Sequence, residues 1–206
     1  MPFLKLNNVQ MDILKETSNI GMGHAATALS QMIGHPVKLR VPHVTITKIS
    51  QVPEYLGGAE KMMVGITLQV LGDARGSILL LFPQESAHRL LCNLIGDQGK
   101  VLIMNEVTIS ALKEVGNILA SAYLSALGSM LHKTLIPSVP LLAYDMAGAV
   151  VDYVLIDLSK SSDLAMLVET DFIGESSSDL AIKGHFFLIP DPSTLDMFLD
   201  AAGGHQ

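Results

Sequence analysis

Residues 12–21 read DILKETSNIG, and residues 110–119 read SALKEVGNIL. When the chain is slid against itself by 98 positions, residues 12–42 align with residues 110–140 without a gap. Ten of the 31 aligned positions are identical. Self-similarity at a fixed offset indicates an internal repeat. The sequence therefore predicts two copies of one unit, near 1–100 and 101–206.

The similarity continues beyond these segments. Residues 75–83, RGSILLLFP, resemble residues 183–190, KGHFFLIP. Each copy is near the small end for an independent fold. We therefore expect a single domain over residues 1–206, in which the two copies share one sheet and one core.

Each copy predicts the same order of elements. Runs of helix formers with apolar residues three and four apart predict a long helix over about 10–34 and again over 106–132. Asn105 supplies a polar start for the second helix. A shorter amphipathic helix is expected to end each copy, near 84–95 and 191–202. Strands are expected near 37–49, 62–71, 75–82, 138–156, 163–172 and 180–189.

The links between the expected strands look too short for parallel crossovers. The sequence therefore predicts an α/β (α+β) fold. We expect a pseudo-twofold arrangement and a mostly antiparallel sheet, with the two long helices carrying the functional residues.

Composition excludes several classes of protein. The chain has 13 basic and 20 acidic residues, a net charge of −7, and no basic stripe, which argues against a nucleic-acid partner. Its single cysteine, Cys92, excludes a disulfide framework and a multi-cysteine metal site. The seven histidines are scattered and form no HExxH pair, so we expect no metal ion of its own.

No segment predicts membrane insertion. The most apolar long stretch, residues 135–156, is interrupted by Pro137, Pro140, Asp145 and Asp152. Residues 1–6 lack the apolar run and cleavage site of a signal peptide. We expect a cytoplasmic protein.

Polar residues recur at matching places in the two long helices. They are Asp12, Glu16 and Asn19 in the first copy and Ser110, Glu114 and Asn117 in the second. Positions i, i+4 and i+7 lie within about 40° of one another around a helix, so each trio shares one face. Pro42 and Pro140 each follow their asparagine by 23 residues, at the entry to the next strand.

A glutamate near an asparagine on a helix usually just belongs to a solvated face without a function. Asp12 could be an acidic residue that is favoured near the start of a helix by the helix dipole. Recurrence at one offset favours a functional interpretation, because aligned core positions such as Ile13 and Ala111 have diverged. Asparagine is also a mediocre helix former, so keeping it twice costs stability. Gly116, before the second asparagine, is expected to let a partner's backbone approach.

The doubled pattern Asp/Ser-x3-Glu-x2-Asn-x22-Pro resembles the CheC family of chemotaxis phosphatases. Residues 19–26, NIGMGHAA, and residues 116–118, GNI, are also similar to that family. The resemblance covers essentially the whole chain. Ser18 and Thr17 depart from Gly116 and Val115 of the second copy.

The resemblance implies hydrolysis of the phospho-aspartate of the response regulator CheY, with Mg²⁺ held by the regulator. It implies catalytic roles for Glu16, Asn19, Glu114 and Asn117. Asp12 and Ser110 would support these residues, and Pro42 and Pro140 would be structural. The resemblance also implies that phosphorylated CheY is a partner and that the deamidase CheD is a second one.

Two other functions stay open. One is a non-catalytic adaptor that binds CheD or the regulator, and the other is a structural component of the flagellar switch. Asp145 resembles part of a CheD-contacting segment of the family, but it could equally be an acidic residue of an edge strand.

Overall fold

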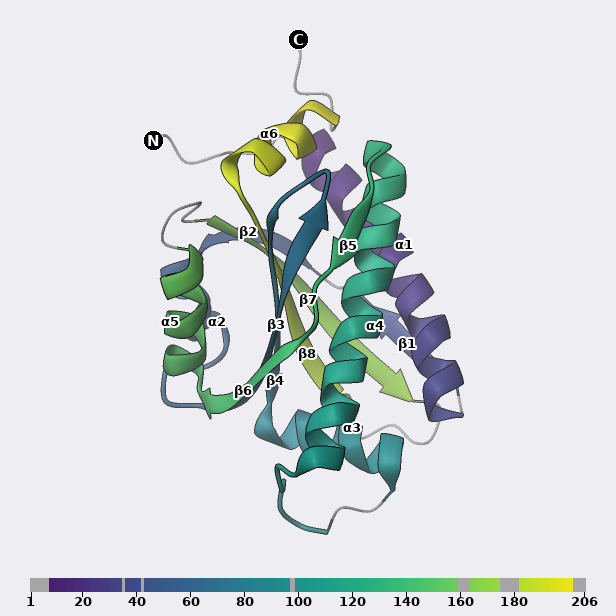
Figure 1. Ribbon diagram of the computed structural model, residues 1–206, viewed down its shortest axis with the longest axis vertical. Helices are drawn as coiled ribbons and strands as arrows, with labels where there is room; N and C mark the ends of the chain where they lie inside the picture. The colour runs from purple at the N-terminus through teal and green to yellow at the C-terminus, as the bar shows by residue number, and fades with distance from the viewer. Residues whose placement is uncertain are drawn as a thin grey trace.

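The computed structural model describes residues 8–34, 36–41, 43–96, 99–158, 164–174 and 182–201 (Figure 1). The helices are α1 (Asn8–Ile33), η1 (Ile49–Gln51), α2 (Val52–Tyr55), α3 (Gln84–Ile95), α4 (Glu106–Leu131), α5 (Ala147–Leu158) and α6 (Pro192–Ala201). The strands are β1 (Val37–Arg40), β2 (Val44–Lys48), β3 (Met62–Gly72), β4 (Gly76–Pro83), β5 (Leu135–Pro137), β6 (Leu141–Met146), β7 (Leu164–Gly174) and β8 (Ile182–Pro190).

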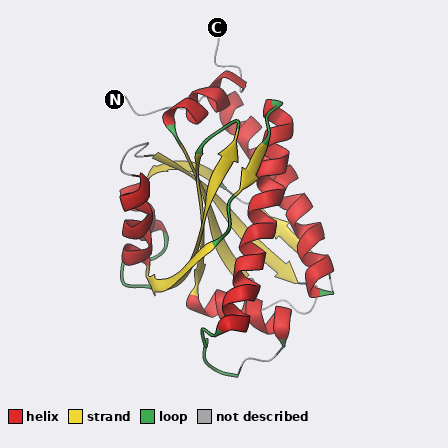
Figure 2. Ribbon diagram, in the orientation of Figure 1, coloured by secondary structure: helices red, strands yellow, loops and turns green. Residues whose placement is uncertain are grey.

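The molecule has three layers around one sheet. The long helices α1 and α4 lie side by side and run in opposite directions on one face of the sheet (Figure 1). The shorter α2 and α5 cover the other face, while α3 and α6 lie at opposite ends (Figure 2). The α/β class is confirmed, and the strands of the described residues all pair antiparallel.

The sheet order reads the same from both ends. The strands run β1-β7-β8-β4-β3-β5, with β2 beside β7 and β6 beside β3. Exchanging β1 with β5, β3 with β7 and β4 with β8 reproduces this order in reverse. The registers also correspond, because Val37 lies opposite Gly174 while Leu135, 98 residues later, lies opposite Gly72. The opening strands of each half therefore pair with the other half, which interlocks the two halves.

Successive side chains of each strand point to opposite faces of the sheet, and both faces are covered by helices. On β8, Phe186 and Leu188 face α1 and α4, whereas Phe187 and Ile189 belong to the cluster under α5. The first cluster is the larger and includes most of the buried face of α4. The long helices are thus fixed to the sheet by their apolar sides, and their polar sides face outward.

Two of the predicted strands are wrong in extent. The strand expected over 138–156 ends at Met146, and residues 147–158 form α5. The strand expected over 37–49 is divided into β1 and β2, and Ile49 begins η1. The two long helices agree with prediction to within two residues at each end.

The helix α5 forms because its surroundings override its β-branched content. Ala147, Val150 and Val151 are buried at helical spacing against the second cluster. The backbone N–H of Ala147 donates to the carbonyl oxygen of Lys61 at 2.8 Å. This contact satisfies one of the donors that a helix start leaves unpaired.

The predicted start of α4 is confirmed in detail. The Asn105 side chain accepts hydrogen bonds from the N–H groups of Val107 and Thr108, both at 3.0 Å. The Asn105 N–H in turn donates to the Thr108 hydroxyl at 2.8 Å, which completes a reciprocal cap. This cap fixes the helix that carries Glu114 and Asn117.

We predict that Asn105→Ala lowers the free energy of unfolding by about 1 kcal/mol, because it leaves N-terminal donors of α4 without their side-chain acceptor. For a chain of this size that corresponds to a fall of about 2–4 °C in Tm. Calorimetry would measure it, with Asn93→Ala at an exposed position of α3 as the control. Equal Tm values for Asn105→Ala and Asn93→Ala would contradict the cap's contribution.

Candidate active site

The second polar trio borders an open groove of about 630 Å³ between α4 and the segment that joins β5 to β6. Ser110, Glu114 and Asn117 line one side of this groove, and Pro140 lines the other. The structure thus brings together all four residues predicted for the second centre. The groove is also lined by Glu106, Ile109, Lys113, Pro137, Ser138 and Val139.

Burial orients the side chains of this centre. Glu114 is exposed and Asn117 is half-buried, whereas their neighbours Val115 and Leu119 are in the core. A helix whose apolar side is packed against the sheet must present the intervening positions outward. The carboxylate and the amide are therefore held on one accessible strip.

The first trio occupies the equivalent face of α1. Asp12, Glu16 and Asn19 are exposed, and the intervening Thr17 and Ser18 are buried. Pro42, the fourth residue predicted for this centre, lies outside the described residues.

The strand β1, which follows α1 in the chain, is hydrogen-bonded directly to that helix. The N–H of Val37 donates to Ser30 Oγ at 2.9 Å, and the same hydroxyl lies 3.3 Å from the Val37 carbonyl oxygen. In the second half a glycine takes the place of Ser30: Gly128, where an added Cβ would lie 2.6 Å from the Lys133 carbonyl oxygen. The two long helices are therefore joined to the strands that follow them by different contacts.

The expected role of Gly116 is wrong. It is buried and faces the sheet, where an added Cβ would lie 2.7 Å from Cγ2 of the core residue Ile66. The glycine therefore allows α4 to approach β3 closely and offers no surface to a partner. Ser18, at the equivalent position of α1, is also buried, and its hydroxyl lies 3.3 Å from that of Tyr123.

Sequence reasoning missed six of the residues that line the groove, and two of these six carried a signal in the repeat. Lys113 and Val139 both line it, and both are identical to their counterparts in the first half, Lys15 and Val41. The repeat identities could have revealed them. Val139 is 81% exposed whereas Val41 is 5% exposed, so the two centres present different apolar surroundings.

Asp145 lies on β6, outside both trios. It is exposed, sits opposite Met63 of β3, and accepts a hydrogen bond from the Met146 N–H at 2.7 Å. The position is that of an acidic residue on an edge strand. Met146 beside it is 48% exposed.

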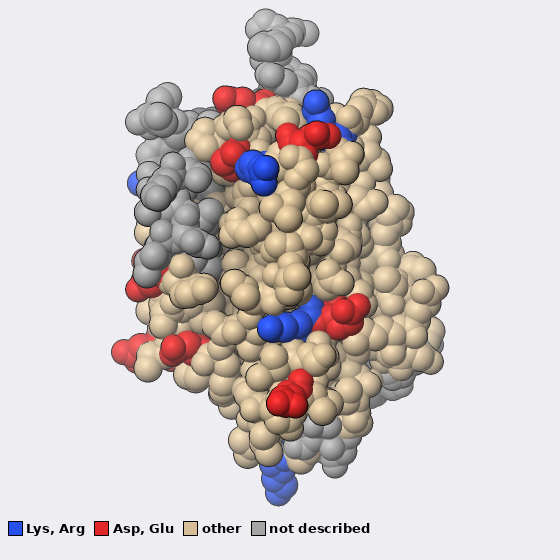
Figure 3. Space-filling view, in the orientation of Figure 1, with Lys and Arg blue, Asp and Glu red and all other residues tan. Residues whose placement is uncertain are grey.

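Charge is sparse over the surface shown in Figure 3, where small groups of acidic and basic side chains are separated by broad uncharged areas. Among the described residues, no three His, Cys, Asp or Glu side chains come together as a metal site would require. The described helices include none long and apolar enough to span a membrane.

The structure is that of an α/β protein in which two long antiparallel helices each present a Glu–Asn pair away from one sheet. Comparison with known sequences shows which family has this arrangement. The model of the CheC-like family matches residues 9–46 and 108–144, the two segments that contain these pairs. The chain is 34% identical over 204 residues to the CheY-P phosphatase CheC of Bacillus subtilis, covering 98% of this chain and 97% of that protein. The chain belongs to the CheC-like family.

Two further proteins show the extent of the similarity. The putative CheY-P phosphatase CheC1 of Halobacterium salinarum is 23% identical over 187 residues, covering 88% of this chain and 90% of that protein. The crystal structure of Thermotoga maritima FliY superposes with a TM-score of 0.76 at 20% identity, covering 98% of this chain and 100% of that one. The latter similarity establishes the fold.

Proposed function

We propose that this protein hydrolyses the phospho-aspartate of a chemotaxis response regulator of the CheY type. The observation that carries the proposal is the Glu–Asn pair, repeated on α1 and α4 and bordered in the second half by an open groove. The family and the 34% identity to a CheY-P phosphatase support it.

The chemistry needs little from the enzyme. An acyl phosphate is already reactive, and the regulator holds its own Mg²⁺ and phosphate-binding groups, so the remaining task is to place a water in line. The carboxamide oxygens of Asn19 and Asn117 accept a hydrogen bond from that water, and an amide needs no tuned pKa to do so. A hundredfold acceleration requires only about 2.7 kcal/mol.

The glutamates dock the regulator. Glu16 and Glu114 each lie one turn before their asparagine on the same exposed strip. There they pair with a cation at the regulator's active site, most simply its lysine. Asp12 and Ser110 extend the strip, and Pro140 shapes the opposite wall of the second groove. Pro42 is the residue that we assign to the first centre from its equivalent place in the sequence.

No metal ion of the enzyme's own takes part in this proposal. The electrophile is activated on the regulator, and the enzyme contributes an amide and a carboxylate at each centre. The reaction takes place in the cytoplasm, within a single domain formed by two copies of one interlocked unit.

An adaptor without activity is the alternative, and it would bind CheD or the regulator by occupancy alone. Asp145 and the exposed Met146 on β6 are the residues we assign to CheD contact. This surface lies on a different element from either Glu–Asn pair, so binding there is compatible with catalysis. The amides that carry the proposal have no role in such an adaptor, and a switch component would not need them either.

The direct test is the decay of phosphorylated regulator with and without this protein. We expect decay to accelerate with protein concentration and its metal dependence to follow the regulator's own ion. Treatment of the enzyme alone with a chelator, followed by its removal, should change nothing. An unchanged decay rate at saturating protein, with and without CheD, would refute the proposal and favour the adaptor.

A further inference from the structure

The two proposed centres are supported from beneath in different ways. Position 18 of α1 and position 116 of α4 are equivalent in the repeat, and each directly precedes the asparagine. Gly116 is pressed against Ile66 of the sheet. Ser18 instead points between the helices, toward the hydroxyl of Tyr123 at 3.3 Å. The first centre is therefore supported by α4, and the second by β3.

Tyr123 also contacts α1 at a second point. An added Cβ at Gly21 would lie 3.0 Å from the Tyr123 Cα, so the two helix backbones lie close together where that glycine stands. A side chain at position 21 would clash with α4, whereas an added Cβ at Gly23 would meet nothing within 4 Å. Tyr123 thus holds α1 at residues on both sides of Asn19.

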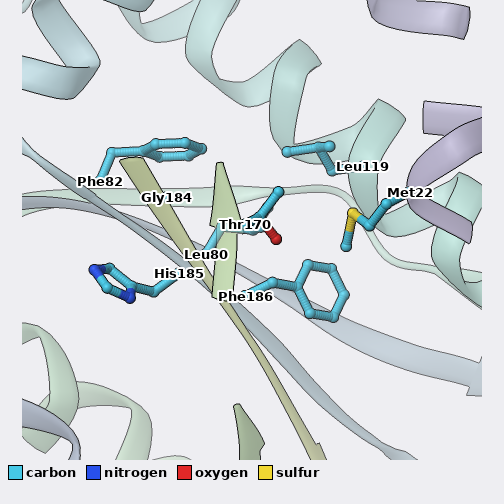
Figure 4. Close-up of a pocket in the computed structure, with 8 residues that line it drawn as sticks. All are labelled: Met22, Leu80, Phe82, Leu119, Thr170, Gly184, His185 and Phe186. Atoms are coloured by element: carbon cyan, nitrogen blue, oxygen red, sulfur yellow. The ribbon is translucent and has the colours of Figure 1, made fainter. Parts of the chain in front are cut away.

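The ring of Tyr123 is itself fixed by the core. It is fully buried and packs on Phe186, with ring centroids 4.6 Å apart and an interplanar angle of 45°. Figure 4 shows Met22 of α1 and Leu119 of α4 lying above Phe186, so aromatic and aliphatic side chains fill the space between the two long helices and β8.

Burial raises the pKa of Tyr123 to about 12. Its phenol therefore stays protonated at the pH of the cell and keeps both hydrogen-bonding capacities.

We propose that Tyr123 is a positioning residue for the first centre alone: through its contacts with Ser18 and Gly21 it sets the orientation of Asn19 on α1. The kinetic test of this inference rests on the proposed function, because it measures regulator dephosphorylation. On this proposal α4 both carries Asn117 and positions Asn19 of α1. The repeat places Ala25 at the position equivalent to Tyr123, so the second centre has no corresponding hydroxyl on α1.

The two centres serve as controls for each other. In an Asn117→Ala background only the first centre is active, and in an Asn19→Ala background only the second. We expect Tyr123→Phe to lower kcat for regulator dephosphorylation about three- to tenfold in the first background, the value of one neutral hydrogen bond. We expect KM to stay unchanged there, and neither constant to change in the second background.

Ser18→Ala should give a similar selective loss. Combining it with Tyr123→Phe should cost less than the product of the two single losses, because both variants remove the same hydrogen bond. A general loss of folded protein would instead lower the activity of both backgrounds together. Equal effects of Tyr123→Phe on the two centres, or strictly multiplicative effects with Ser18→Ala, would overturn the proposal.

A measurement without the regulator separates this inference from the proposed function. Relaxation of side-chain amide groups by NMR should show greater mobility of the Asn19 amide in Tyr123→Phe, with the Asn117 amide unchanged. If neither centre is active but the Asn19 amide still loosens, the function fails and the positioning role stands. An Asn19 amide that stays as ordered as in the parent protein would overturn the positioning role, whatever the activity.

Discussion

Replacing both asparagines, Asn19→Ala with Asn117→Ala, is expected to lower the accelerated decay of phosphorylated regulator by at least about a hundredfold. Without an amide at either centre, the attacking water loses the group that holds it in line, and about 2.7 kcal/mol of barrier reduction goes with it. Initial decay rates at matched regulator concentrations would measure this loss.

The fold should survive the change. Asn19 is exposed and Asn117 half-buried, and alanine is the better helix former by about 0.5 kcal/mol, so Tm should hold or rise slightly. Asn93→Ala, at an exposed position of α3, is the matched control and should keep full activity. A double variant that melts like the parent yet retains most of its activity would show that the amides do not act in the reaction.

The helices and both polar trios were predictable because their signals are local. Helix formers at three- and four-residue spacing and the Asn105 cap define α4 within the chain itself. The outward direction of Glu114 and Asn117 follows from the apolar residues around them. These features can be predicted without knowing which strands of the sheet pack against the helix.

The errors lie where distant contacts decide the outcome. Residues 147–158 are rich in β-branched residues. They form a helix because they pack against the cluster under α5 that contains Phe187 and Ile189, and because the Lys61 carbonyl accepts from the first N–H. Gly116 looked available to a partner because nothing in the sequence places Ile66 of β3 beneath it. The pairing of β1 with β7 and of β5 with β3 likewise depends on topology that the repeat alone does not specify.

The glutamates should have a different kinetic effect from the asparagines. We expect Glu16→Gln with Glu114→Gln to weaken regulator binding about 30-fold, which corresponds to about 2 kcal/mol, while kcat changes less than twofold. Glutamine keeps the length and shape of the side chain and removes only the charge. The loss should therefore appear as a higher KM, because a docking charge acts equally in the bound state and the transition state.

Two controls show whether the effect on binding comes from the charges of Glu16 and Glu114: the dependence of affinity on ionic strength, and a substitution of the neighbouring Glu106. Affinity of the parent protein should fall as ionic strength rises, and affinity of the Gln variant should depend on salt much less. Glu106 also borders the second groove, but it has Asn8 at its equivalent position in the first half, so Glu106→Gln controls for a general negative field. We expect it to change KM less than twofold. A comparable effect of Glu106→Gln would indicate diffuse attraction, and a loss confined to kcat in the double Gln variant would place the carboxylates in the chemical step.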